Sequence, residues 1–440
     1  MIALALLACS CSEPLPPPPE AELPDVVWVT LDTTRADYLG VYGGDPTPAF
    51  DGLAARGVRF DWMISHVPAT LSSHSSMFTG MDPHGHGVPM NGYPLSDEAE
   101  TLAERMQSLG YQTIAVIGAS VLESDMGLDQ GFGVYDDTLG DKKTRRYEDR
   151  ADVVNQRVWA ALEQRDPERP LFLWVHYFDA HAPYEAPEEW HQKFVDADYT
   201  PSWGDKPFAT GDTAKFGELT PQDLEYVKDS YRAEVAWQDH NLGQLVEGLE
   251  ERESMDALVV MADHGDLFGD APDRRFGHAS SVNFAVVRVP ALLLAPGLSP
   301  AVIQRPTRTS DMATTLLSAL GLQGLGDGLD LMTTDEAVPI FVEATKPKKI
   351  AKRAREEDLW NNTFKPRAVL YEDLYLVSVP YAKTEQVYRV GQPMKPTPRK
   401  DEVVEEARAA LKVWDEAAPP FRDNSMTSET RKALEALGYL

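Results

Sequence analysis

Five runs of apolar, β-favouring residues divide the first 300 positions of the chain. The first, "DVVWVTLD" (25–32), is continuous and shows no alternation of polar and apolar positions. Such continuity is typical of a strand that is buried on both faces, as in a parallel sheet. Similar runs recur at 113–118, 171–178, 257–263 and 290–296.

Amphipathic stretches separate these runs. "AETLAERMQSLG" ends on Gly110, in the position of a helix C-cap, and "VVNQRVWAALEQR" and "AEVAWQDHNLGQLVEGLEER" carry apolar residues at helical spacing. The alternation of strands and helices predicts an α/β fold, a sandwich with a largely parallel central sheet flanked by helices.

The pattern changes towards the C-terminus. "TKPKKIAKRAR" (345–355) is a basic run, "AVLYEDLYLVSV" and "EQVYRV" alternate like antiparallel strands, and "DEVVEEARAALKVWDEAA" predicts a helix with an acidic start. We interpret the basic run as a solvated loop or as a rim that steers anions to a site. The predicted organisation is a leader and tether (1–24), a main domain (25–330) and a small α+β subdomain (331–440).

The N-terminal segment, "MIALALLACSCSEPLPPPPEAELP", begins with a short apolar run that ends at Cys9. The run is too short to span a bilayer. It resembles a bacterial lipoprotein signal, in which Cys9 would be lipidated and Pro16 to Pro19 would form a stiff tether. No Lys or Arg precedes the run, although signal peptides normally carry one there. We expect a protein of the bacterial cell envelope, periplasmic or attached to the outer membrane, which meets a membrane only through this lipid.

Composition narrows the function classes. The net charge of −29 excludes a general affinity for nucleic acids or anionic membrane surfaces, because both are bound through excess positive charge. Both cysteines, Cys9 and Cys11, lie in the first dozen residues. The rest of the chain therefore has no catalytic thiol, no thiolate metal site and no disulfide.

Acids and histidines follow three of the apolar runs. Asp32 ends the first run, Asp179 and His181 follow the third, and Asp263 and His264 follow the fourth. In parallel sheets, ligand-binding residues gather at the carboxyl ends of the strands. The carboxylates of Asp32 and Asp263 with the imidazole of His264 suit a divalent metal ion, Zn²⁺ or Mn²⁺ before Ca²⁺ or Mg²⁺.

A stretch rich in hydroxyls, "PATLSSHSSMFTG" (68–80), predicts a short helix between a proline and a glycine. The N-terminus of such a helix attracts negative charge. A hydroxyl in its first turn would become a nucleophile if it also bound a metal ion. Thr70 is placed for this role, and Ser72 and Ser73 are its rivals. Spacing does not choose among them.

Several motifs occur in a recognisable order. They are "VVWVTLDTTRADYLGVYG", "VPATLSSHSSMFTGMDPHGHGV", "HYFDAHAPY", "ADHGDLFGD", "GHASS" and, at the end of the chain, "ETRKALEALGYL". Together they resemble the sulfatase family of the alkaline phosphatase superfamily. The resemblance implies that residues 25–330 are catalytic and that the metal is held by Asp32, Thr70, Asp263 and His264.

The same resemblance implies roles for three catalytic residues. Thr70 stands at the nucleophile position, His181 matches a histidine that can protonate the leaving oxygen, and His278 matches a position near the substrate. His86 and Asp239 match residues that support the fold, and we expect a scaffold ion pair for Arg35.

The chain also departs from true sulfatases, which have a Cys or Ser at the nucleophile position and convert it to formylglycine. Here Thr70 takes that position, and Ser72 and His74 replace the Pro and Arg that accompany it. Thr33 and His264 stand where sulfatases have Asp and Asn, which favours a transition metal over Ca²⁺. Threonine nucleophiles resemble those of the superfamily's phosphodiesterases, phosphonate hydrolases and phosphoethanolamine or glycerophosphate transferases.

These observations predict a metal-dependent hydrolase of a small anionic ester, either a sulfate or a phosphate or phosphonate. The alternatives are a transferase of the phosphoethanolamine or glycerophosphate type and a non-catalytic surface binding protein on the same fold.

Overall fold

The computed structural model describes residues 23–140, 148–204, 206–208, 219–271, 274–335, 337–345, 364–392 and 402–420. The leader with Cys9, the basic residues 346–355 and the closing "ETRKALEALGYL" lie outside the described residues. Within the described ranges, no helix combines the length and the apolar character needed to cross a bilayer.

The core of the molecule is a nine-stranded mixed sheet. Its strands, in spatial order, are β11 (Ala301–Arg308), β2 (Val58–Ile64), β10 (Ala291–Leu294), β6 (Ala257–Ala262), β1 (Val26–Leu31), β5 (Leu171–Tyr177), β3 (Gln112–Val116) and β4 (Val134–Asp136), with β9 (Arg288–Val289) beside β2. The strands from β6 to β4 are parallel to one another, and β11 is parallel to β2. The predicted α/β class and largely parallel sheet are confirmed. The run at 290–296 is a strand, but β10 is antiparallel to both of its neighbours.

The register of the central strands decides where the polar residues gather. Leu31, the last residue of β1, lies opposite Tyr177 of β5 and Ala262 of β6. All residues of these three strands are buried, as their continuous apolar sequences predict. The residues that follow the strands, Asp32 and Asp263 among them, therefore emerge side by side at one edge of the sheet.

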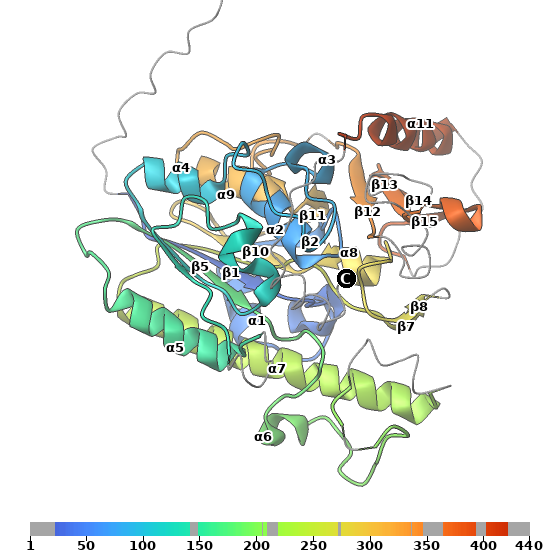
Figure 1. Cartoon of the computed structure of the whole chain (residues 1–440), viewed down its shortest axis with the longest axis horizontal. Helices are drawn as coiled ribbons and strands as arrows, with labels where there is room; N and C mark the ends of the chain where they lie inside the picture. Colours follow the sequence, from blue (N-terminus) through green and yellow to red (C-terminus); the bar gives the residue numbers. More distant parts are fainter. Residues whose placement is uncertain are drawn as a thin grey trace, which may run out of the picture.

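Helices cover both faces of this sheet (Figure 1). In the view of Figure 1, α2, α4 and α9 lie above the sheet, and α5 and α7 lie below it. The helices are α1 (Pro48–Ala54), α2 (Thr70–Thr79), α3 (Pro83–His86), α4 (Leu102–Ser108), α5 (Ala151–Leu162), α6 (Glu188–His191), α7 (Pro221–Glu251), α8 (Phe284–Val287), α9 (Asp311–Ala319) and α11 (Glu402–Glu416). Short 3-10 helices span Ala36–Tyr38, Gly40–Tyr42, Ser120–Leu122, Ser124–Met126 and Pro380–Ala382.

α7 begins about twelve residues earlier than its apolar pattern predicts. Thr220 and Asp223 form a reciprocal capping box at its N-terminus, with Pro221 in the first helical position. These are standard start signals for a helix. The periodicity of "AEVAWQDHNLGQLVEGLEER" captured only the part of α7 that packs on the core.

A small antiparallel sheet follows the central one along the chain. It contains β12 (Ile340–Glu343), β13 (Arg367–Tyr371), β14 (Leu374–Val379) and β15 (Thr384–Arg389), and a separate ribbon joins β7 (Phe268–Ala271) to β8 (Arg274–Phe276). The small sheet and α11 lie at the right of Figure 1. Apolar side chains of one face of the sheet share a buried cluster with α8, and those of the other face share one with α11. The domain boundary at residue 331 stays a prediction.

A buried ion cluster links the small sheet to α11. Lys365 Nζ lies 3.3 Å from Glu343 Oε1, Arg367 also pairs with Glu343, and Arg367 Nε donates to Asp415 Oδ1 at 2.7 Å. The side chains of Glu343, Lys365 and Arg367 are at most 1 % exposed. Burial alone would raise the pKa of Glu343, but the charges of Lys365 and Arg367 outweigh it and hold the pKa below its ordinary range.

We expect Glu343→Ala to destabilise the protein by about 3 to 5 kcal/mol, because it removes the carboxylate that compensates the buried charges of Lys365 and Arg367. The lowered pKa of Glu343 also means that its contribution is full above the pKa of an unfolded-chain glutamate, about 4.3, and is lost as the pH falls below that value. Urea unfolding of the wild type and the variant between pH 3 and 7 measures both effects. Glu405→Gln, in an exposed pair with Arg408, is the control and should change stability by less than about 1 kcal/mol. An equal effect of the two substitutions would contradict this account.

Candidate active site

Three side chains converge at the carboxyl edge of the central sheet. Asp32 follows β1, and Asp263 and His264 follow β6. One ligand atom from each lies within 4.8 Å of the others, and all three residues are fully buried. The sequence predicted this group, and its geometry is that of residues that could hold a metal ion.

Local hydrogen bonds orient these ligand atoms. His264 Nδ1 donates to the carbonyl of Gly265 at 3.1 Å, which leaves Nε2 as the nitrogen available to a metal. Asp263 Oδ1 accepts from the backbone N–H groups of His264 at 2.7 Å and Thr33 at 3.2 Å. Gly265 is required for the turn, because a Cβ at this position would lie 2.1 Å from the carbonyl oxygen of Ala285.

Three carboxylate oxygens of the group remain without a hydrogen-bond partner among the described residues: both oxygens of Asp32 and Oδ2 of Asp263. Burial raises the pKa of Asp32 well above its ordinary value, and the charges of Asp263 and Asp266 raise it further. Burial also raises the pKa of Asp263 to about 6 and keeps that of His264 well below its ordinary value. A cation held by these atoms would compensate the buried negative charge, so the residues fit a divalent metal ion.

α2 presents Thr70 to this group. Thr70 is the first residue of the helix, after Ala69 in an extended conformation, and its Oγ1 lies 3.4 Å from His264 Nε2. The helix ends at Gly80, which adopts the left-handed conformation with φ 69°. A Cβ at Gly80 would lie 2.3 Å from the carbonyl oxygen of Leu325, so only glycine fits here. Every residue of α2 is buried, which fixes the position of the Thr70 hydroxyl.

The other five hydroxyls of the stretch are engaged elsewhere. Ser72 donates to the carbonyl of Val88 at 2.6 Å, and Ser73 donates to the carbonyl of Asp263 at 2.8 Å. The remaining three are bound as follows: Ser75 to the carbonyl of Leu71, Ser76 to His86 Nε2, and Thr79 to the carbonyl of Ser75. Of the three hydroxyls that spacing left open, Thr70, which the resemblance favours, is the one whose oxygen contacts the imidazole of the metal-binding group.

Two further histidines extend the group. The ring of His278 lies 4.3 Å from that of His264, and the ring of His181 lies 5.4 Å from that of His278. His181 Nδ1 donates to the carbonyl of Ala182 at 2.6 Å. Burial, with the charge of His278, lowers the pKa of His181 to about 3. The structure thus brings together all five residues that the sequence singled out with Thr70.

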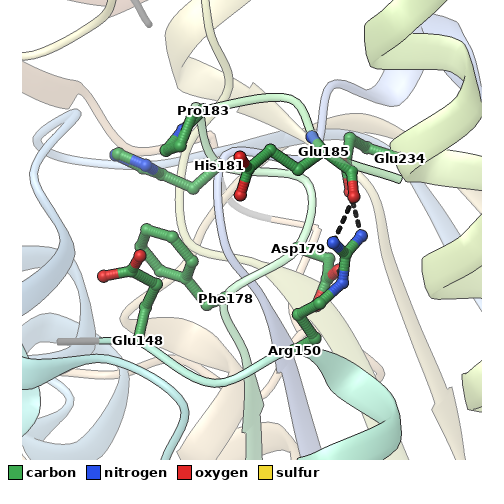
Figure 2. A pocket seen from close by; sticks show the side chains of 8 residues that line it. All are labelled: Glu148, Arg150, Phe178, Asp179, His181, Pro183, Glu185 and Glu234. Carbon is green, nitrogen blue, oxygen red and sulfur yellow. Dashed lines mark hydrogen bonds and ion pairs between the residues drawn. The ribbon is translucent and has the colours of Figure 1, made fainter. Parts of the chain in front are cut away.

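His181 also borders a small cavity of about 40 Å³. Figure 2 shows His181 at one side of this cavity and Arg150 at the other, beside Asp179 and Glu234. Arg150 lies 3.6 Å from Glu234 and 3.9 Å from Asp179. Asp179 follows a strand as Asp32 does, but it accepts from the backbone N–H of Ala151 at 2.7 Å and so caps α5.

Three residues near the group were not predicted from the sequence pattern to contact it. His176 Nε2 lies 3.7 Å from Asp32 Oδ2, and His74 Nδ1 lies 3.9 Å from Asp263 Oδ2. Thr33 has a positive φ of 51°, which is strained for a β-branched residue, and its buried hydroxyl has no hydrogen-bond partner among the described residues. A histidine inside the apolar run of β5 was the one available signal for His176.

The expected scaffold residues make scaffold contacts. Arg35 pairs with Asp37 at 2.6 Å, Asp239 accepts from two backbone N–H groups at the start of α1, and His86 Nε2 lies 3.0 Å from the hydroxyl of Ser76. None of these contacts involves the three metal-binding side chains.

Comparison with known proteins supplies the family context. Residues 24–322 match the family described as "Sulfatase". Curated relatives include an arylsulfatase of Clostridium perfringens (22% identical; 56% of this chain and 64% of the relative) and a choline-sulfatase of Rhizobium meliloti (22%; 62% and 63%). The chain thus spans just under two thirds of the length of these two relatives.

Solved structures show the same fold. The phosphonate monoester hydrolase of Agrobacterium radiobacter has a TM-score of 0.70 at 18% identity, over 90% of this chain and 95% of that one. A protein solved in complex with its substrate D-glucosamine-2-N,6-O-disulfate has a TM-score of 0.69 at 16% identity, over 92% of this chain and 100% of that one.

Proposed function

The chain belongs to the sulfatase family, and on that premise we propose that it is a metal-dependent hydrolase of sulfate, phosphate or phosphonate esters with Thr70 as its nucleophile. The observation that carries the proposal is the position of the Thr70 hydroxyl, 3.4 Å from His264 Nε2 in the buried group of Asp32, Asp263 and His264. The names of the relatives support it, since they include sulfatases and a phosphonate monoester hydrolase.

The chemistry of residue 70 favours phosphorus esters within this proposal. Formylglycine is made from a cysteine or serine at the nucleophile position, and residue 70 is neither. The secondary hydroxyl of Thr70 must therefore act directly. A threonine nucleophile resembles those of the superfamily's phosphodiesterases, phosphonate hydrolases and phosphoethanolamine or glycerophosphate transferases, which act on phosphorus esters or phosphonates.

Asp32, Asp263 and His264, together with the hydroxyl of Thr70, would hold the divalent ion. A mixed oxygen and nitrogen set suits Zn²⁺ or Mn²⁺ better than Ca²⁺ or Mg²⁺. When bound, such an ion would neutralise the two carboxylates and lower the pKa of the Thr70 hydroxyl.

The residues of the chain then have the following roles. Thr70 Oγ1 attacks the sulfur or phosphorus atom, a bond to Thr70 forms, and the bond to the leaving alcohol oxygen breaks. The N-terminal end of α2 stabilises the negative charge that develops on the transferred group. His181 or His278 gives a proton to the leaving oxygen, and water cleaves the threonine ester in the second half of the reaction.

A turnover screen of the purified protein tests this proposal. The protein is stripped of metal, reloaded with Zn²⁺ or Mn²⁺, and assayed with an aryl sulfate, a phosphate monoester, a phosphate diester and a phosphonate monoester. We expect metal-dependent release of the alcohol from at least one substrate, greatest with a phosphorus ester. Release that requires an added alcohol acceptor would favour the transferase. No turnover of any substrate by metal-loaded protein would favour the binding protein and overturn the hydrolase.

We also propose that the protein is held at the bacterial cell envelope by a lipid on Cys9. The support is the apolar run that ends at this cysteine and the proline-rich tether after it. The unaltered protein should sediment with membranes in its native host, and Cys9→Ser should release it. Recovery of the unaltered protein in the cytosolic fraction with Met1 intact would contradict the proposal.

A further inference from the structure

Another buried carboxylate, that of Asp266, lies beside His278, one of the two candidate proton donors. It follows Gly265 at the end of β6 and is 1 % exposed. Its Oδ1 accepts from the backbone N–H of Leu267 at 2.9 Å, and its Oδ2 accepts from the hydroxyl of Tyr184 at 3.1 Å. His278 Nδ1 lies 3.6 Å from Asp266 Oδ1. Both oxygens of the side chain therefore face fixed donors.

Asp266 thereby joins the two loops that carry the histidines. Tyr184 lies three residues after His181 in the loop that follows β5, and His278 lies in the loop that follows β8. The backbone at Asp266 is itself anchored, because its carbonyl accepts from Arg35 Nη1 at 3.2 Å. One buried carboxylate thus fixes the geometry between the metal-binding turn and both loops.

We propose that Asp266 is a positioning residue that orients the imidazole of His278 for transfer of a proton to the leaving oxygen. A carboxylate near Nδ1 turns that nitrogen towards itself and leaves Nε2 on the opposite side of the ring for the substrate. His181 differs in that its Nδ1 donates to the carbonyl of Ala182; the charge of Asp266 also acts on His181, so the variants of both histidines must be compared. The inference rests on the proposed function and assigns the donor role, which the sequence left open between two histidines, to His278.

The proton of the Thr70 hydroxyl is lost to solvent before the attack, and threonine leaves again as its alkoxide in the second half-reaction, so the remaining proton transfers pass through His278. In the first half-reaction, His278 gives the proton of Nε2 to the alcohol oxygen as the bond from that oxygen to phosphorus or sulfur breaks. In the second, the water that cleaves the threonine ester returns a proton to Nε2. Asp266 keeps the ring in place throughout and exchanges no proton.

The test compares two substrates of the same acid, one with an alkyl leaving group and one with p-nitrophenol. An alkoxide is a poor leaving group and depends on protonation, whereas p-nitrophenolate leaves without it. We expect Asp266→Asn to lower kcat for the alkyl ester by about 10- to 100-fold and for the aryl ester by less than about threefold. His278→Gln should show the same selective loss, and the double variant should be no worse on the alkyl ester than His278→Gln alone.

Two controls separate positioning from structural damage. Asp239→Asn changes a buried aspartate whose oxygens cap α1 and do not contact His278, so both substrates should change little and by similar factors. His181→Gln should lack the selective loss. Equal losses of Asp266→Asn on both substrates, or a selective loss in His181→Gln but not in His278→Gln, would overturn the proposal. If Asp266→Asn fails to fold, Asp266→Glu, which keeps the charge but displaces the carboxylate from His278, takes its place with the same expected selective loss. If the hydrolase proposal itself is wrong, the wild type will turn over neither substrate, and this result differs from every outcome expected when only the role of Asp266 is wrong.

Discussion

Thr70→Ala is expected to reduce turnover by several orders of magnitude while the protein remains folded. The hydroxyl of Thr70 is the only one of six in its stretch that contacts His264, and no cysteine is available to replace it. Thr70→Ser should keep partial activity, because it preserves the oxygen and loses only the methyl group that restricts the side-chain rotamer. Single-turnover kinetics of both variants on an aryl phosphodiester, with metal content measured in parallel, give the comparison.

Ser72→Ala and Ser73→Ala are the matched controls for Thr70→Ala. Each removes a buried hydroxyl of the same helix that donates to a backbone carbonyl, and the hydroxyl of Ser73 also forms a hydrogen bond of 3.0 Å with that of Ser65. The loss of one such bond costs about 1 kcal/mol, so each control should reduce turnover by about tenfold or less. Near-normal turnover of Thr70→Ala, or a larger effect in either serine variant, would place the nucleophile elsewhere.

Asp263→Ala and His264→Ala are each expected to abolish metal binding and the stabilisation that binding provides. A ligand present at 100 times its Kd stabilises the folded state by about 2.7 kcal/mol, so added Zn²⁺ or Mn²⁺ should raise the Tm of the wild type and leave both variants unchanged. Without metal, Asp263→Ala should have a small net effect on stability, because it loses the two hydrogen bonds that Asp263 Oδ1 accepts but also removes the repulsion between the buried carboxylates of Asp32 and Asp263.

Asp239→Asn is the control for the metal ligands. Asp239 is also a buried aspartate, but its oxygens cap α1, so this variant should bind a full equivalent of metal and show the same metal-dependent rise in Tm as the wild type. Elemental analysis after dialysis reports the metal content. A full equivalent of metal in Asp263→Ala or His264→Ala would show that the ion is held by other residues.

The strands of the core were predictable because burial on both faces leaves a continuous apolar run. A continuous apolar run does not show the direction of a strand. "PALLLAP" correctly predicted a strand, but β10 is antiparallel to both β2 and β6. An apolar run indicates that a strand is buried, but it does not reveal whether the strand is parallel or antiparallel to its neighbours. The start of α7 was missed for a related reason, since its first turns carry capping residues and no apolar stripe.

The metal-binding group was predictable to the extent that its residues follow strands. Asp32, Asp263 and His264 are brought together by the register of β1 and β6, which parallel pairing dictates. Spacing could not choose among Thr70, Ser72 and Ser73, because all three lie in the first turns of one buried helix, and the choice of Thr70 came from the resemblance. The contact between Thr70 and the metal-binding group depends on how α2 packs in the folded chain, and the local sequence pattern does not predict such contacts.

Asp266 illustrates that limit. It lies in the quoted motif "ADHGDLFGD", but its partners Tyr184 and His278 are distant in sequence and reach it only in the folded chain. The strained φ of Thr33 is likewise a property of the turn between β1 and the metal-binding group and not of the residue type.

The most direct test of the account is mass spectrometry of the covalent intermediate. Metal-loaded protein is mixed with an aryl phosphodiester, quenched in acid within one turnover and digested with trypsin, which places all six hydroxyls in the peptide 60–105. The account predicts a phosphoryl ester on Thr70 that is absent from Thr70→Ala. An ester on one of the serines, or full turnover with no protein ester at any quench time, would contradict it.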